Sequence, residues 1–393
     1  MMSAVLSNPS HPKYGVATIP FPIPRDQYTY CTDLLEALEI GDAVKADCKV
    51  EKIDSFYTVL KRVEMLTVNV EELNYLAKRL ESFDTGEAAQ FQAMAHKLEL
   101  FELKDLINLT FCCQQATVIT DFSDLAAIGR DHYMNLHGGS ASVDELNKLD
   151  GKGTARQLIE SGSGTITPYG VVYDNGMKLE QIYDGRFFPC YYYEPNAITI
   201  AVISKAEPED TNHITWLFLP MVQEEIDRAL LRGGITDPAD VRLRLEDSQL
   251  PNEVDVLLDM EHEALSDLNE LAGATDGLSK ADMEKLGAVV TLAEPKSAAQ
   301  IKNLAESLDL FDLAPGAHTP QGYGKYMIQQ SGHFDYDENL DAFYDYEKYG
   351  TERMNEEDGM FTDRGYIAYK GYISIEEVMN GGQSSHMVMR GMM

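Results

Sequence analysis

The sequence repeats itself, and this repetition limits the folds open to the chain of 393 residues. The first half realigns on the second half at a nearly constant shift. Ser3–Ser7 matches Ile200–Ser204 at a shift of 197, and Glu72–Ala77 matches Asp267–Ala272 at a shift of 195, by subtraction. A period of this length lies far outside the range of solenoid repeats, so we expect a tandem pair of domains rather than a stacked array.

Further matches lie in the same order along both halves. They pair Thr18–Pro22 with Thr215–Leu219, Leu106–Leu109 with Ile301–Leu304, Ile128–Arg130 with Tyr323–Lys325, Gly153–Arg156 with Gly350–Arg353, and Gly170–Val172 with Gly365–Ile367. We therefore predict that residues 1–190 and 191–376 are two copies of one unit, followed by a flexible tail over 377–393. The alternative is two unrelated α+β domains.

Both copies show the same α+β plan, with small β-sheet parts around a central helical block. In the second copy, periodicity predicts strands at Ile198–Ile203 and Ile214–Phe218, a helix at Gln223–Arg232 and a strand at Val241–Leu245. The helical block is predicted at Glu71–Ser82, Glu87–Glu99 and Glu102–Cys112 in the first copy, and at Val254–Ala272, Ser279–Val290 and Ser297–Leu308 in the second. Ser279 and Ser297 are typical N-cap residues.

A hairpin is predicted at the end of each copy. The two hairpins pair Thr165–Thr167 with Val171–Tyr173, and Met360–Thr362 with Tyr366–Tyr369. The segment Phe187–Asn196 between the copies is rich in tyrosine and proline, so we expect a packed joint there rather than a flexible linker.

An acidic and aromatic stretch, Phe334–Gly350, lies near the end of the second copy. Read as a helix over Glu338–Tyr349, it would turn Leu340, Phe343 and Tyr344 toward a core, with Gly350 as a left-handed C-cap. Glu338, Asp341 and Asp345 would then share the opposite face. A solvated helix face is the ordinary interpretation of such a row of acids.

The charge of the whole chain favours a second interpretation, in which the acids carry the function. The formal net charge is −33, and residues 191–393 hold 38 acids against 15 bases, whereas residues 1–190 hold 27 against 17. Such an excess repels nucleic acid, but it can occupy a protein groove that grips phosphates through lysine and arginine. The counterpart of the acidic stretch in the first copy, Val143–Asp150, is weaker in both acids and aromatics.

Motifs for catalysis, metal binding and cofactor binding are weak. His137–Ser140 has no nucleophile elbow to serve it, and Gly151–Thr154 lacks the spacing of a phosphate loop and reads better as a helix cap. Glu261–Glu263 lacks the second histidine of a zinc protease, and Asp335–Glu338 lacks the spacing of a calcium loop. The five cysteines form no CxxC pair. We expect no enzyme, no cofactor and no metal, and, without a signal peptide or membrane span, a cytoplasmic protein.

Each copy resembles the ArdA-type antirestriction proteins of conjugative plasmids and transposons, and the resemblance is clearest in the second copy. The residues that carry the resemblance are Leu219-Pro220 with Glu224-Glu225, Asp267–Leu271, Gly324–Tyr326 and, above all, Leu340–Arg353. The resemblance implies an elongated, three-part α+β protein that mimics bent B-form DNA. It also implies that the protein blocks type I restriction-modification enzymes at their DNA groove without catalysis, and so protects incoming mobile DNA.

The resemblance implies no direct binding of nucleic acid and no membrane, and it places the DNA-mimic surface in the second copy. The implied surface residues are Asp335, Asp337, Glu338, Asp341, Asp345, Glu347, Glu352, Glu356, Glu357 and Asp358. Relatives one copy long form homodimers, so we expect either a monomer that acts as a pseudo-dimer or a homodimer. The alternative function is an acidic scaffold of a mobile element that inhibits another DNA-binding partner.

Overall fold

The computed structural model describes residues 2–382, which divide into two compact units. Unit 1 contains the chain up to Glu194, together with Ala206–Trp216 and Val222–Asp237, and unit 2 contains Pro195–Lys205, Leu217–Met221 and the chain from Pro238. The boundary between units therefore differs from the predicted boundary between sequence copies. The segment that follows Val222, although it belongs to the second copy in sequence, packs with unit 1.

Unit 1 opens with an antiparallel sheet in the order β2-β1-β3-β4. Its strands are β1 (Met2–Ser7), β2 (Val16–Phe21), β3 (Cys48–Asp54) and β4 (Thr67–Val68). Along β2, buried Ala17, Ile19 and Phe21 alternate with more exposed residues, which is the period expected of a sheet with one face on a core. Helix α1 (Tyr28–Ala37) follows β2.

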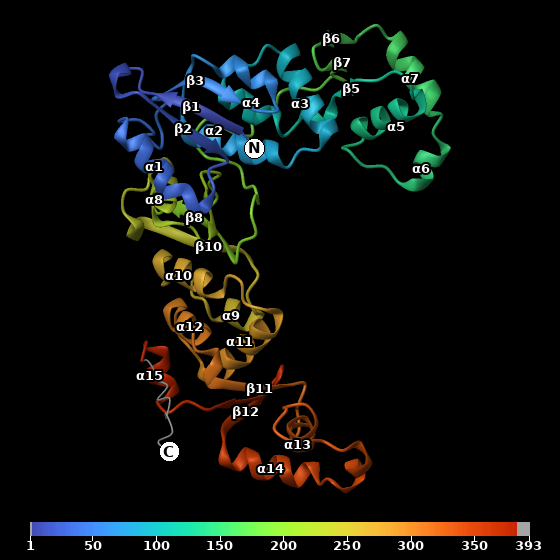
Figure 1. Cartoon of the computed structure of the whole chain (residues 1–393). Helices are drawn as coiled ribbons and strands as arrows, with labels where there is room; N and C mark the ends of the chain where they lie inside the picture. The colour runs from blue at the N-terminus through green and yellow to red at the C-terminus, as the bar shows by residue number, and fades with distance from the viewer. Residues whose placement is uncertain (1, 383–393) are drawn as a thin grey trace, which may run out of the picture. The chain divides into compact units, whose positions relative to one another are not determined.

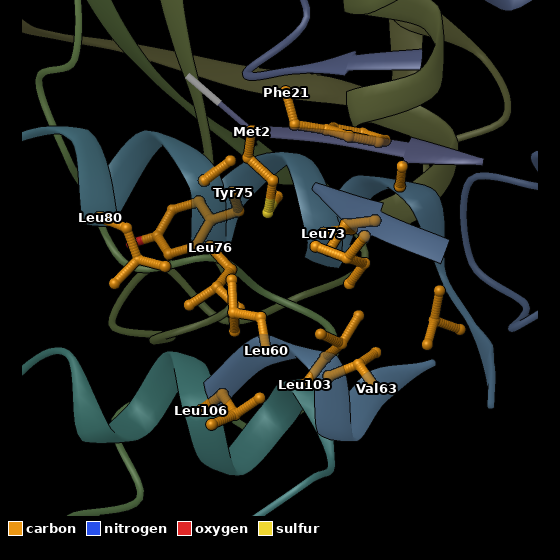
Figure 2. Packing of buried hydrophobic residues seen from close by; sticks show 14 of the residues in the cluster. Met2, Phe21, Leu60, Val63, Leu73, Tyr75, Leu76, Leu80, Leu103 and Leu106 are labelled. Atoms are coloured by element: carbon orange, nitrogen blue, oxygen red, sulfur yellow. The ribbon is translucent and has the colours of Figure 1, made fainter. Parts of the chain in front are cut away.

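The helical block of unit 1 supplies the other side of this core. It comprises α2 (Val70–Glu81), α3 (Thr85–Lys97) and α4 (Leu103–Leu109). In Figure 2, Met2 and Phe21 of the sheet meet Leu73 and Leu76 of α2, with Leu103 of α4 close by. Burial of each such leucine contributes about 1.5–3 kcal/mol, so this cluster anchors the sheet to the helices.

The last part of unit 1 combines a small sheet with three helices (Figure 1). The sheet has the order β5-β7-β6, with β5 (Thr117–Ile119), β6 (Thr165–Thr167) and β7 (Gly170–Tyr173). The helices are α5 (Leu125–Leu136), α6 (Val143–Lys148) and α7 (Gly151–Glu160). Helix α8 (Gln223–Arg232) also belongs to unit 1.

Unit 2 contains two small antiparallel sheets joined by helices. The first sheet has the order β10-β8-β9, with β8 (Ile198–Ser204), β9 (Thr215–Leu219, of which Leu217–Leu219 belong to unit 2) and β10 (Val241–Ser248). The helices that follow are α9 (Asn252–Leu257), α10 (Leu265–Thr275), α11 (Lys280–Ala293) and α12 (Ala298–Ala305). The second sheet has the order β11-β13-β12, with β11 (Phe311–Pro315), β12 (Asp358–Thr362) and β13 (Gly365–Tyr369). Helices α13 (Pro320–Gln329), α14 (Tyr346–Glu356) and α15 (Ile375–Met379) complete the unit.

Local sequence signals placed many of these elements correctly, and the α+β class is confirmed. Helix α8 has the predicted bounds, both closing hairpins form, and Ser279 and Ser297 cap α11 and α12 by accepting backbone N–H groups. The segment Phe187–Asn196 packs as expected, because Phe188 stacks on Tyr75 with ring centroids 4.5 Å apart.

One predicted helix, Val254–Ala272, is wrong, because the structure breaks it between α9 and α10. The break contains a turn at Asp259, whose carboxylate accepts hydrogen bonds from the Glu261 backbone and from the His262 ring at 3.2 and 2.8 Å. Such local side-chain hydrogen bonds compete with the helical backbone pattern.

The predicted tail over 377–393 is only partly covered by the structure. Its first residues belong to α15, where Val378 is buried and the Met379 carbonyl accepts a hydrogen bond from Asn303 at 2.8 Å. The first residues of the predicted tail are therefore packed, and residues 383–393 lie outside the described residues.

Most elements recur in the same order in the two halves, from β1 to β7 and from β8 to β13, but β4 has no counterpart in the described part of the second half, where a 3₁₀ helix stands in place of α6. Equivalent contacts recur at a shift of 195, by subtraction, except that Ile23 and Met221 are 198 residues apart. Asn74 accepts from the Ile23 amide and Asn269 from the Met221 amide, each at 2.8 Å; Tyr169 hydrogen-bonds Thr58, and Arg364 hydrogen-bonds Glu253. The match of Gly153–Arg156 at 197 is not the structural register. The N-caps of α7 and α14, Asp150 and Asp345, are 195 residues apart.

Candidate protein-binding surface

The acidic stretch does not form the predicted helix over Glu338–Tyr349. The structure has a 3₁₀ helix at Glu338–Phe343 and then α14, which begins at Tyr346. The carboxylates divide the stretch, because Asp337 accepts from the Asn339 amide at 2.9 Å and Asp345 accepts from the Lys348 amide at 3.1 Å. Each acid thus starts its own helix as an N-cap.

The predicted inward face of this stretch is wrong as well. The side chains of Leu340 and Phe343 are 47% and 84% exposed. Tyr344 is half-buried and lies between the rings of Tyr336 and Tyr346. The helical spacing of these apolar residues therefore does not bury them, because Leu340 and Phe343 face the solvent.

Gly350 is not a C-cap but lies inside α14, at its crossing with α13. A Cβ on Gly350 would lie 1.9 Å from the backbone oxygen of Pro320, and one on Gly324 would lie 2.0 Å from that of Tyr346. Only glycine permits so close an approach of two helix backbones. Figure 1 shows the two helices beside the second sheet of unit 2, and this crossing fixes the base of the acidic stretch.

Asp341 lies at the centre of a hydrogen-bonded cluster. Its carboxylate accepts from the hydroxyls of Tyr346 and Tyr336 at 2.5 and 2.7 Å, and from the Gln329 amide at 2.8 Å. These hydrogen bonds, that from Tyr346 first, lower the pKa of Asp341. Asp341 therefore orients the 3₁₀ helix on α13 and α14, and its charge is largely satisfied within the protein.

Three further acids of α14 and its end interact with basic residues. Glu357 pairs with Arg353 and accepts from the Tyr323 hydroxyl at 2.5 Å, and its side chain is only 8% exposed. Glu356 pairs with Arg353 at 3.5 Å, and Glu352 pairs with Lys348 at 4.0 Å, but both of these acids are largely exposed. Glu357 thus holds α14 in place and cannot meet a partner, whereas Glu352 and Glu356 can.

The remaining acids are exposed and uncompensated. Within residues 2–382, the carboxylates of Asp335, Glu338, Glu347 and Asp358 form neither hydrogen bonds nor ion pairs. We use "acidic surface" for the exposed acids of this region: Asp335, Asp337, Glu338, Asp345, Glu347, Glu352, Glu356 and Asp358. Of the predicted site residues, only Asp341 and Glu357 are left out, because each has an internal role.

Arg364, which no sequence pattern singled out, ties this region to the helical block of unit 2. Arg364, in the β12–β13 turn, donates to both oxygens of Glu253 at 2.8 and 2.7 Å and also pairs with Glu284. Its guanidinium lies directly over Gly287 of α11. Arg364 lowers the pKa of Glu253 through these hydrogen bonds. A single arginine in a hairpin turn gave no sequence signal for this contact.

Two arginines of α8, which no sequence pattern singled out either, dock this helix within unit 1. Arg228 donates to Glu71 at 2.6 Å and to the Gly41 carbonyl at 2.7 Å. Arg232 is only 4% exposed and is surrounded by acceptors of unit 1. Helix α8 is therefore bound to unit 1 by buried charge-assisted hydrogen bonds.

The motifs considered for catalysis occupy ordinary structural positions. Gly151–Thr154 forms the first turn of α7, capped by Asp150, and Glu261–Glu263 lies in the turn before α10. Across residues 2–382, no group of three or more histidine, cysteine or acidic side chains could hold a metal ion. In the same range, no helix combines the length and apolarity needed to cross a bilayer.

A comparison with known families identifies the class of protein to which this acidic domain belongs. The family model described as antirestriction protein (ArdA) matches residues 211–368, which run from just before β9 into β13 and include the whole acidic surface. These residues therefore form an antirestriction domain. Over these residues the chain matches the ArdA type, as the sequence resemblance predicted. A search of curated proteins finds no match.

Proposed function

We propose that this protein inhibits type I restriction-modification enzymes by placing its acidic surface in their DNA groove, and so protects incoming mobile DNA. The family match implies an antirestriction role and restriction enzymes as partners. The observation that carries the finer proposal is the set of exposed, uncompensated carboxylates at Asp335, Glu338, Glu347 and Asp358, all inside the matched residues.

The proposal follows from the way proteins bind DNA. Most protein–DNA hydrogen bonds go to phosphates and sugars, and lysine and arginine neutralise the phosphates. A protein surface with fixed carboxylates can occupy the same cationic groove. The hydrogen bonds of Asp337, Asp341 and Asp345 fix the backbone that presents the exposed acids, so little ordering cost remains at binding. Inhibition by this route needs no catalysis.

We further propose that the chain is a tandem duplicate in which residues 1–190 are a diverged ArdA-like copy. The largely repeated order of elements supports this proposal, and so do the equivalent contacts Tyr169–Thr58 and Arg364–Glu253 at a shift of 195. Such a monomer would supply in one chain what relatives assemble as a homodimer. The counterpart of the acidic surface in the first copy is weaker in acids, so we assign inhibition to the second copy.

The proposed function predicts stoichiometric inhibition of a purified type I methyltransferase, in competition with DNA and weakened by salt. Charge reversal of Asp335, Glu338, Glu347 and Asp358 to lysine should abolish this inhibition. Because none of these side chains holds the fold together, the variant should keep its helix content. The measurement is a DNA-competition assay alongside circular dichroism.

A matched control reverses four exposed acids of unit 1, namely Asp33, Glu36, Glu99 and Glu160. This variant has the same net charge as the first, and it should inhibit like the wild type. Equal loss in both variants would show that total charge, not the acidic surface, governs binding. No response of any type I enzyme to the wild type would instead favour the scaffold alternative.

A further inference from the structure

An exposed apolar ridge, formed by Leu340 and Phe343, runs beside the acids of the 3₁₀ helix. These side chains are 47% and 84% exposed. In a 3₁₀ helix with three residues per turn, side chains three apart lie in one row. The helix Glu338–Phe343 therefore has one row of Glu338 with Asp341, one of Asn339 with Ala342, and one of Leu340 with Phe343.

The ridge points outward because the neighbouring row is fixed. Asp341 is held by the hydroxyls of Tyr336 and Tyr346, so the helix cannot rotate to bury Phe343 without breaking that cluster. A third apolar side chain, Phe334, is 50% exposed and packs edge-on against Tyr349 at the start of the same stretch. Isolated exposed apolar residues are common, but here they recur within one charged stretch and the backbone is fixed in the conformation that exposes them.

We propose that Leu340 and Phe343 contact the part of a restriction-modification enzyme that reads DNA bases, while the flanking acids contact its phosphate-binding residues. This inference rests on the proposed function and adds a second kind of contact to it. Charge complementarity indicates the partner, because the uncompensated Asp335, Glu338 and Glu347 flank the ridge and favour binding in a cationic groove. A DNA-reading groove also contains positions that contact base edges and thymine methyl groups, and carboxylates cannot satisfy the apolar ones.

The two kinds of contact respond differently to salt. Ion pairs with phosphate-binding residues weaken steeply as salt rises, whereas burial of an apolar side chain does not. Phe343→Ala should therefore lower the affinity about tenfold at every salt concentration, which corresponds to about 1.4 kcal/mol. A plot of log affinity against log salt should shift down without a change of slope. Glu338→Gln with Glu347→Gln should reduce the slope instead.

The test measures the affinity of a purified type I methyltransferase for the full-length protein over a series of salt concentrations. Phe56→Ala is the matched control, because Phe56 is 71% exposed in unit 1, outside the proposed surface. Circular dichroism checks that each variant is folded. We expect Phe56→Ala to bind like the wild type, and Phe343→Ala to show the parallel shift.

Three outcomes would overturn the inference. If Phe343→Ala binds like the wild type while the glutamine variant loses salt dependence, the ridge has no role and the proposed function stands. An equal loss in Phe56→Ala and Phe343→Ala would show that the effect is not specific to the ridge. If the wild type does not compete with DNA at all, the proposed function fails and this inference fails with it.

Discussion

Replacement of Arg232 by alanine tests how α8 is held in unit 1. The guanidinium donates to the carbonyls of Arg186 and Ala43 at 2.8 Å each, to Asn69 at 3.0 Å and to the Gly185 carbonyl at 3.1 Å. It also hydrogen-bonds the Tyr183 hydroxyl and stacks on the Phe188 ring. Arg232 thus joins α8 to the loop before β3, to the cap of α2 and to the segment after β7, all within unit 1.

The expected cost follows from the burial of this network. Glu72 lies 3.7 Å from the guanidinium, and burial raises the pKa of Glu72, so its carboxylate depends on nearby donors. Removal of one partner from a buried ionic network costs about 3–5 kcal/mol, because the other polar groups lose their hydrogen bonds. At a urea dependence of about 2–3 kcal/mol per M, the unfolding midpoint of unit 1 should fall by about 1–2 M.

Urea titration, monitored by circular dichroism, provides the measurement. The matched control is Arg244→Ala, which removes an arginine that is 53% exposed and pairs with Glu246 at the surface of β10. Surface pairs contribute about 1 kcal/mol or less, so this variant should unfold almost like the wild type. If Arg232→Ala and Arg244→Ala lose the same small amount, the reasoning about buried hydrogen bonds is wrong.

Three further predictions concern unit 2. Gly324→Ala should lower the free energy of unfolding by at least about 2 kcal/mol, because the new Cβ would lie 2.0 Å from a backbone oxygen of α14. Its control is Gly273→Ala in α10, where no neighbour lies nearer than 4.0 Å, and this change should raise the free energy of unfolding by about 0.5–1 kcal/mol. A double-mutant cycle of Arg364 and Glu253 should give a coupling of about 1.5–3 kcal/mol, and zero coupling would show that this ion pair does not stabilise unit 2. The hydrogen bonds that lower the pKa of Asp341 stabilise the folded stretch at pH values above 3.8, the ordinary pKa of an aspartate, and this contribution is lost as the pH falls through the folded pKa. The NMR shifts of Tyr336 and Tyr346 should therefore change only below about pH 4.

Short-range signals explain what the sequence could predict. The bounds of α8 follow from one amphipathic period, and the capping box of α11 follows from Ser279 and Asp282, three residues apart. The closing hairpins follow from alternating strands around turn residues. Each of these elements is determined by residues that are near one another in the chain.

Contacts between distant residues explain what the sequence could not predict. Arg364 and Glu253 are 111 residues apart, and Arg232 and Ala43 are 189 apart, so no local pattern shows either contact. The prediction of one helix over Glu338–Tyr349 was wrong for a related reason. Its helical spacing was real, but Asp341 gains more from the two tyrosine hydroxyls of its surroundings than a continuous helix would offer.

The proposed duplication gives a physical reason for which identities remain between the halves. Gly170 and Gly365 have φ values of 125° and 137°, and a Cβ on either would lie within 2.7 Å of a strand carbonyl, so both turns require glycine. Asn74 and Asn269 each accept a hydrogen bond from a backbone amide, which a shorter side chain could not reach.

Where a contact joins only side chains, the two halves use different residue types at equivalent positions. Tyr169 and Thr58 share a hydroxyl hydrogen bond of 2.9 Å at the positions where Arg364 and Glu253 form an ion pair. A pair of interacting side chains can be exchanged for another complementary pair without moving the backbone. A glycine at positive φ, or an asparagine that accepts from a backbone amide, cannot be replaced so freely. The same freedom applies to exposed acids, which no internal contact retains, so the first copy could lose its acidic surface and keep its fold.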